Sequence, residues 1–190
     1  MRYVAIVGNN ATTSTNRTLL QCIAKRHADQ ADFDIQEIRP LPAFKPSDDR
    51  TVPPPEQVQT LIDAIAASDG VIIATPEYNH SVPAPLKSAL EWLSWSSEVM
   101  RGAPVMIVGA AYGRLGTSRA QQHLRDILTS PWLRARTLAS EFLLGNSLQA
   151  FDEDGNLVDP ADVAALDAHF AEFQAFARII KDVNAKERAS

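Results

Sequence analysis

The chain repeats one order of segments: a short apolar run, then a polar loop, then a stretch with the spacing of a helix. Four runs have the length of a β-strand and occupy residues 3–7, 33–38, 71–74 and 105–108. A fifth strand is expected within residues 137–144. Strands that are joined through helices run parallel, so the order predicts an α/β fold with helices on both faces of a parallel sheet.

Apolar residues at helical spacing separate these strands. The last helix is expected to begin at Asp159-Pro160, because proline is favoured in the first helical turn. Before it, Asp154-Gly155 indicates a tight turn between two short extended segments. The other expected helices are the segment with Leu20 and Ile23, the segment with Val58 and Ile65, residues 86–95, and the segment with Leu124 and Ile127.

Length and composition limit the class of protein. The chain has 190 residues, 45% of them hydrophobic, which is enough for one substantial core, so we expect a single domain over residues 1–190. The formal net charge of −5 lacks the basic excess that nucleic-acid binding requires. No apolar run has the ~20 residues needed to cross a membrane, and the first residues turn polar too soon for a signal peptide. We expect a soluble, cytoplasmic protein with neither nucleic acid nor membrane as a partner.

Cysteine and histidine carry little chemistry in this chain. The single cysteine, Cys22, lies in a helical segment and is expected to be a buried, unreactive thiol. The histidines, His27, His80, His123 and His169, are scattered and have none of the spacings of a zinc site. We expect no metal site.

The loop after the first strand predicts a phosphate site. Ligands of doubly wound sheets bind at the carboxyl ends of strands, and Gly8 is followed there by a loop rich in hydroxyl and amide side chains, residues 9–16. The loop has neither the glycines of a dinucleotide fingerprint nor the lysine of a P-loop. It leads into a helix, whose first N–H groups attract anions. The alternative is that Ser14 or Thr15 only caps this helix.

The loop after the third strand presents a carboxylate, an aromatic ring and an amide together. Its residues Pro76, Glu77, Tyr78 and Asn79 directly follow a buried strand, and further prolines stiffen the backbone. A stiff loop of this kind can hold N–H groups at the edge of a planar heteroaromatic ring while the tyrosine packs near its face. The alternative is an ordinary turn with a surface tyrosine.

Residues 76–92 resemble the signature of the NAD(P)H-dependent FMN reductase family, which includes quinone, azo and chromate reductases. The resemblance extends over about residues 3–128. In the first loop, Ser14 and Asn16 match the family pattern, whereas Asn9, Ala11 and Thr13 depart from it. The resemblance implies the flavodoxin-like fold, a three-layer sandwich with a five-stranded parallel sheet in the order 2-1-3-4-5.

The resemblance also implies an FMN site made by three loops. The residues of the first loop, expected at the FMN phosphate, are Asn9, Ser14, Thr15 and Asn16. Those of the second loop, expected at the isoalloxazine ring, are Pro76, Glu77, Tyr78 and Asn79. Those of the third loop, expected to support the pyrimidine side of the ring, are Ala111, Tyr112 and Gly113. No side chain is expected to act as a catalytic acid or base, because the flavin supplies the chemistry.

The implied activity is hydride transfer from NADH or NADPH through FMN to a small acceptor such as free flavin, a quinone or an azo compound. The alternative is a flavodoxin-like electron carrier that does not itself oxidise NAD(P)H. The resemblance further implies a homodimer or a dimer of dimers. We place the helix of residues 86–95 in that interface, because Trp92 and Trp95 cannot both lie on its sheet-facing stripe.

The resemblance implies two further details of these loops. The backbone N–H groups of Tyr78 and Asn79 are expected to face the flavin ring. The family often has an arginine where this chain has Ala11, and we expect Arg17 to point along its helix instead of into the loop. FMN is then held by neutral donors with moderate affinity, and more tightly than riboflavin, which has no phosphate.

Overall fold

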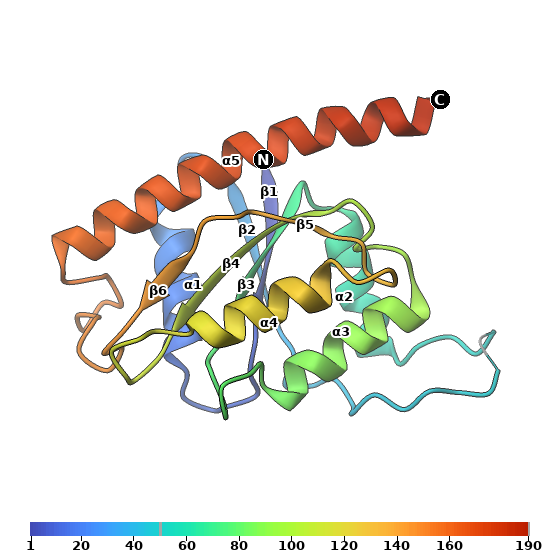
Figure 1. Ribbon diagram of the computed structural model, residues 1–190, viewed down its shortest axis with the longest axis horizontal. Coiled ribbons are helices and arrows are strands. Elements are labelled where there is room, and N and C mark those ends of the chain that lie inside the picture. Colours follow the sequence, from blue (N-terminus) through green and yellow to red (C-terminus); the bar gives the residue numbers. More distant parts are fainter. Residues whose placement is uncertain (50, 190) are drawn as a thin grey trace.

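The computed structural model describes residues 1–49 and 51–189. Within them a six-stranded parallel sheet has the order β2-β1-β3-β4-β5, and β6 also pairs with β4 (Figure 1). The strands are β1 (Arg2–Val7), β2 (Asp32–Glu37), β3 (Gly70–Ala74), β4 (Pro104–Ala110), β5 (Arg136–Thr137) and β6 (Phe142–Leu144). The helices are α1 (Thr15–Arg26), α2 (Glu56–Ala66), α3 (Ala84–Ser96), α4 (Ser118–Leu128) and α5 (Pro160–Ala189). The expected flavodoxin-like order is confirmed.

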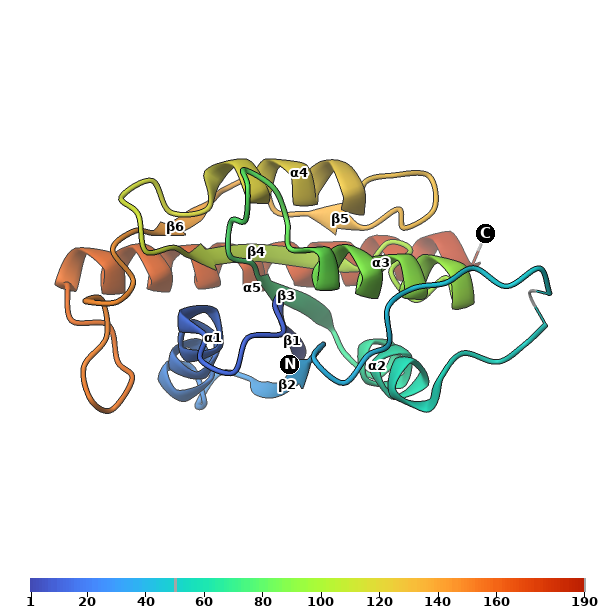
Figure 2. The same cartoon turned by 90° about the horizontal axis from the view of Figure 1, so that it is seen from below.

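The sheet divides the hydrophobic core into two layers. Side chains alternate along a strand, so Tyr3 and Val7 of β1 pack with α1 and α5, whereas Val4 and Ile6 pack with α2, α3 and α4 (Figure 2). Strands β3 and β4 are buried along their whole length. Burial on both faces explains why they appear in the sequence as continuous apolar runs.

The expected fifth strand is broken into β5 and β6. Both pieces pair with β4, β5 near its start and β6 near its end. Between them Ser140 directs its polar groups to the neighbouring helices: its hydroxyl lies 3.0 Å from His169 Nδ1, and its carbonyl accepts a hydrogen bond of 3.0 Å from Arg125. Because the break depends on contacts with α4 and α5, the local sequence does not reveal it.

The two tryptophans of α3 lie outside its buried stripe, as expected. They pack with the proline-rich segment between β2 and α2, residues 40–49 and 51–55. The Trp92 indole N–H donates to the Pro42 carbonyl at 2.9 Å. The Phe44 ring stands edge-on to both indoles, with centroid distances of 5.1 Å to Trp92 and 5.9 Å to Trp95.

The chain ends in the long helix α5, which runs along one face of the sheet (Figure 1). It begins at Pro160, as expected, and the preceding turn bridges Phe151 and Leu157 with Gly155 at φ +77°. Cys22 is buried, and this burial raises the pKa of its thiol.

No helix in the described part of the chain is long and apolar enough to span a bilayer. Nowhere in the described residues do three His, Cys, Asp or Glu side chains come together in a way that could hold a metal ion.

Candidate functional site

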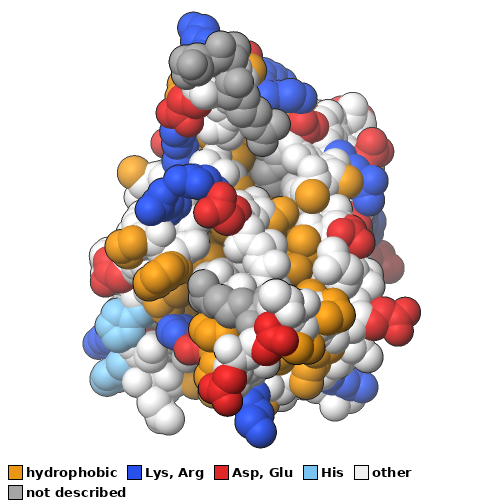
Figure 3. All heavy atoms as spheres, turned by 90° about the vertical axis from the view of Figure 1, so that its right-hand side faces the viewer, with side chains coloured by type: hydrophobic (Ala, Val, Ile, Leu, Met, Phe, Trp, Pro, Cys, Tyr) orange, Lys and Arg blue, Asp and Glu red, His pale blue; other side chains and the backbone are white. Residues whose placement is uncertain are grey.

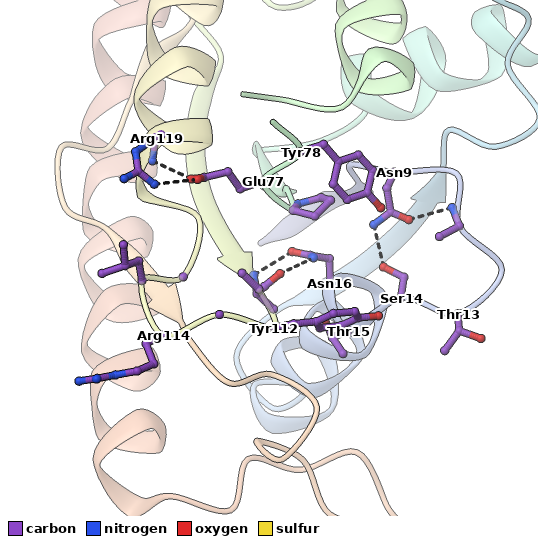
Figure 4. Close-up of a pocket in the computed structure, with 17 residues that line it drawn as sticks. Asn9, Thr13, Ser14, Thr15, Asn16, Glu77, Tyr78, Tyr112, Arg114 and Arg119 are labelled. Carbon is purple, nitrogen blue, oxygen red and sulfur yellow. Dashed lines mark hydrogen bonds and ion pairs between the residues drawn. The ribbon is translucent and has the colours of Figure 1, made fainter. Parts of the chain in front are cut away.

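A cavity of about 560 Å³ lies at the carboxyl ends of the strands, where the loops after β1, β3 and β4 meet (Figure 4). The sequence-predicted residues that line it are Asn9, Ser14, Thr15, Asn16, Pro76, Glu77, Tyr78, Ala111, Tyr112 and Gly113. Asn79 does not line the cavity. The fold thus brings three separate loops to one place, as parallel strands require.

Buried polar side chains fix the first loop. The Asn9 amide donates to Ser14 Oγ at 2.8 Å, and Asn9 Oδ1 accepts from the Ala11 N–H at 3.0 Å. Ser14 is the N-cap of α1 and accepts from the Arg17 N–H at 3.3 Å. These side chains hold the loop in shape and have most of their hydrogen bonds within the protein.

The third loop is tied to the start of α1. The Asn16 side chain exchanges two hydrogen bonds, of 2.8 and 2.9 Å, with the backbone of Ala110. The Thr15 hydroxyl lies 3.0 Å from the Ser147 hydroxyl, and the Ser147 N–H donates to the Ala111 carbonyl at 3.0 Å. Ser147 lies far along the chain and has no motif around it, so the sequence did not indicate it.

Backbone N–H groups at the start of α1 are free. Among the described residues, no hydrogen bond uses the N–H groups of residues 12, 13, 15 and 16. The first turn of a helix has no partner for such groups, and its dipole places partial positive charge there. The end of the cavity at Thr13 and Thr15 therefore suits an anion such as a terminal phosphate.

The expectation for Arg17 was wrong. Its guanidinium folds back over the loop and donates to the carbonyls of Ala11 and Thr12, each at 3.1 Å. It also pairs with Glu37, with Nη2 2.9 Å from Oε2. A forked cation can satisfy loop carbonyls and a carboxylate together, which a position along the helix surface would not allow. Arg17 shapes the phosphate end and is absent from the cavity lining.

The expectation for the Tyr78 N–H was also wrong. This group donates to the Ser81 carbonyl at 3.0 Å, and the Ser81 N–H donates back to Tyr78 at 3.0 Å. Between them Asn79 and His80 have φ of +51° and +63°, as in a two-residue hairpin turn. The turn closes on itself, so the Tyr78 N–H is not available to a ligand.

Glu77 has a role that the sequence did not indicate. Its side chain is 12% exposed and accepts from the backbone N–H groups of Arg119 and Ala120 at 3.0 and 3.2 Å. It also accepts from the Arg119 guanidinium at 3.2 Å. A second link joins His123 to Ser81, with Nδ1 3.1 Å from Oγ. The second loop is thereby held against α4.

Large hydrophobic side chains border the cavity and are open to solvent. Tyr78 is 48% exposed, Tyr112 64% and Leu115 67%. Leu115, in the loop before α4, and Arg119, in the first turn of α4, also line the cavity and were not among the predicted site residues. A cavity with an anion-binding end and an aromatic border fits a phosphate-bearing planar ligand such as FMN.

Comparison with known proteins identifies the family. The model of the NADPH-dependent FMN reductase family matches residues 1–149. The chain belongs to this family. It is therefore an oxidoreductase that uses FMN with NAD(P)H as the donor.

Individual similarities agree with this membership. The reductase is 53% identical to the NADH:(hydroxy)cinnamate reductase subunit CrdA of Vibrio ruber, over 95% of this chain and 89% of that protein. It is 42% identical to the NADH-dependent flavin reductase subunit 2 of Lactobacillus johnsonii, over 93% and 97%. Among solved structures, FerB, a flavoenzyme NAD(P)H:(acceptor) oxidoreductase from Paracoccus denitrificans, has a TM-score of 0.79 and 26% identity, over 95% and 97%.

Proposed function

We propose that the cavity is the FMN site of this reductase. The free N–H groups of residues 12, 13, 15 and 16 bind the phosphate, and the loops at Pro76–Tyr78 and Ala110–Gly113 hold the ring. The single observation that carries this proposal is the occurrence of unbonded helix N–H groups and an exposed aromatic border in one cavity. The ring stays open on one side, where a nicotinamide or an acceptor can stack.

The protein contributes binding and orientation. FMN bound there would supply the redox chemistry, the transfer of electrons from the nicotinamide to an acceptor. The links of Asn16 to Ala110 and of Glu77 to α4 keep the three loops in register around the ring. We assign no proton transfer to a side chain.

The acceptor we propose is a small planar molecule, such as a free flavin, a quinone, an azo compound or an aromatic enoate. The names of the relatives, which include a flavin reductase and a (hydroxy)cinnamate reductase, support this range. An open border made of Tyr78, Tyr112 and Leu115 accepts flat apolar faces with little demand for a specific polar pattern.

Steady-state oxidation of NADH and NADPH by the FMN-loaded protein tests this function. We expect rapid oxidation that speeds up when a quinone or free flavin is added. Binding of FMN without oxidation of either nicotinamide would instead support the electron-carrier alternative. Failure to bind FMN would contradict both.

We also propose a homodimer. Figure 3 shows hydrophobic side chains gathered in the lower middle of one face, with charged side chains around them. A second copy could cover such a face. A second candidate is a subunit of a larger reductase, because the two relatives at 53% and 42% identity are named as subunits. Use of NADH or NADPH supports a cytoplasmic location.

A further inference from the structure

An ion pair stands in the wall of the cavity. Glu77 and Arg119 both line it, from the loop after β3 and from the start of α4 (Figure 4). The Glu77 carboxylate receives three hydrogen bonds, two from backbone N–H groups at the start of α4 and one from the Arg119 guanidinium. The positive end of the α4 dipole is thus directed at Glu77.

The charges at this end of the cavity compensate one another. Glu77 carries one negative charge, and Arg119 together with the helix terminus supplies positive charge beside it. Among the described lining residues, Arg114 is the other charged side chain, and it is exposed. Loss of Glu77 would uncover the positive charge of α4, whereas loss of Arg119 would leave the carboxylate less compensated. The two losses therefore change the local potential in opposite directions.

We infer that the Glu77–Arg119 pair sets the reduction potential of the bound flavin. The inference rests on the proposed placement of FMN in this cavity. Hydride transfer adds two electrons and one proton to the ring, so the reduced ring carries one more negative charge than the oxidised ring. Fixed charges in a partly desolvated wall act on that difference: a carboxylate disfavours the reduced form, and a guanidinium favours it.

A purely structural role for Glu77 would give a different pattern of reduction potentials in the two variants. If the pair only held the second loop against α4, loss of either partner would loosen the loop in the same way. Both variants would then weaken FMN binding without opposite changes in potential. The sign of the shift in the two variants therefore distinguishes electrostatic tuning from simple support.

The test is the midpoint potential of FMN in four full-length variants, measured by spectral equilibration with a reference dye. Glu77→Gln keeps an oxygen acceptor for α4 but removes the charge, and it should raise the potential. Arg119→Gln should lower it. Arg119→Lys, which keeps the charge, should restore the parent value. Arg101→Gln breaks the exposed pair with Glu98 and serves as the matched control, with no expected shift.

We expect each of the first two shifts to match about a tenfold change in the ratio of dissociation constants for oxidised and reduced FMN, or about 30 mV for a two-electron couple. Unchanged potentials, or shifts of the same sign, would overturn the inference while FMN binding by the parent still supported the proposed site. Absence of FMN binding by the parent would contradict both. If Glu77→Gln does not fold, the variants of the half-exposed Arg119 decide alone: Arg119→Gln should lower the potential, and Arg119→Lys should restore it.

Discussion

The polar residues of the first loop act mainly through the backbone they shape. Asn9, Ser14 and Asn16 are buried and bond to neighbouring protein groups. Their residue types led to the prediction that this loop lines a ligand cavity, and the loop does line the cavity. Their partners, however, follow from the packing of β4 and α1, and no local pattern states them. In the proposed site, the groups that face the phosphate are N–H groups that any residue except proline would supply.

Ala11 lines the cavity at the proposed phosphate site and has no charge to offer. Replacing it with arginine should strengthen FMN binding by about 1.5–3 kcal/mol, the usual size of a hydrogen bond to a charged group. The gain should shrink with added salt. Titration with FMN and with riboflavin checks this, because riboflavin has no phosphate. An equal gain for riboflavin would show that Ala11 does not lie beside the phosphate.

His80 occupies a left-handed backbone position at φ +63°. A branched side chain is strained there, so His80→Val should lower the free energy of unfolding by about 1–2 kcal/mol. His80→Gly relieves the strain and should be close to neutral. Urea unfolding of the two variants measures the difference. Equal stability of the valine and glycine variants would mean that the turn does not hold this conformation in solution.

At the scale of elements, α1 and α5 enclose a buried histidine. The His27 ring stacks on Phe170 with a centroid distance of 4.1 Å. Its Nε2 lies 3.6 Å from the Asp167 carboxylate, beyond hydrogen-bond distance, and neither ring nitrogen has a hydrogen-bond partner in the described residues. Burial lowers the pKa of His27 below its usual 6.5. The same cause lowers the pKa of His169. Both rings therefore stay neutral in the folded protein at a pH where the unfolded chain takes up protons.

Stability should therefore fall as the pH drops below about 6.5, by up to about 1.4 kcal/mol per pH unit for each such ring. His27→Leu should flatten this slope by about half, because His169 remains. The exposed His80→Gln variant is the control and should keep the full slope. Urea unfolding measured at several values from about pH 7.5 to about pH 5, the range in which histidine titrates, provides the slope. An unchanged slope in His27→Leu would refute the buried neutral state.

Most elements follow from the sequence because burial and helix signals are local. The apolar runs in β3 and β4 are fully buried. Pro160 begins α5, in agreement with the preference of proline for the first position of a helix. The break between β5 and β6 could not be predicted in this way. It depends on side chains of α4 and α5 that reach Ser140 from distant parts of the chain.

At the scale of the whole molecule, the fold explains why three motifs form one site. Parallel strands present their carboxyl ends at one edge, so the positions of the three loops were predictable. The contacts between loops were not. The links of Glu77 to α4 and of Thr15 to Ser147 join residues that nothing in the sequence pairs.

The proposed dimer makes a prediction at this scale. Sedimentation of the purified protein at micromolar concentration should give the mass of two chains. The hydrophobic side chains on the face shown in Figure 3 would then be covered by the second copy. A single-chain mass would contradict the homodimer and would favour the alternative in which a different subunit covers that face.

The phosphate site can be tested through one N–H group. Thr15 is the first residue of α1, a position where proline is tolerated, and the preceding Ser14 already has the extended backbone that proline requires, with φ −147° and ψ 116°. Thr15→Pro therefore removes one N–H donor while keeping the helix. Thr15→Ala is the matched control, since it loses the same hydroxyl but keeps the N–H.

The deciding measurement is the affinity of the parent and both variants for FMN and for riboflavin, obtained by quenching of flavin fluorescence. The parent and Thr15→Ala should prefer FMN. Thr15→Pro should weaken FMN binding by about 1.5–3 kcal/mol, the cost of losing a hydrogen bond to a charged group, and leave riboflavin binding unchanged. Equal affinities of the parent for the two flavins, or equal FMN affinities of the alanine and proline variants, would contradict an FMN phosphate held at the start of α1.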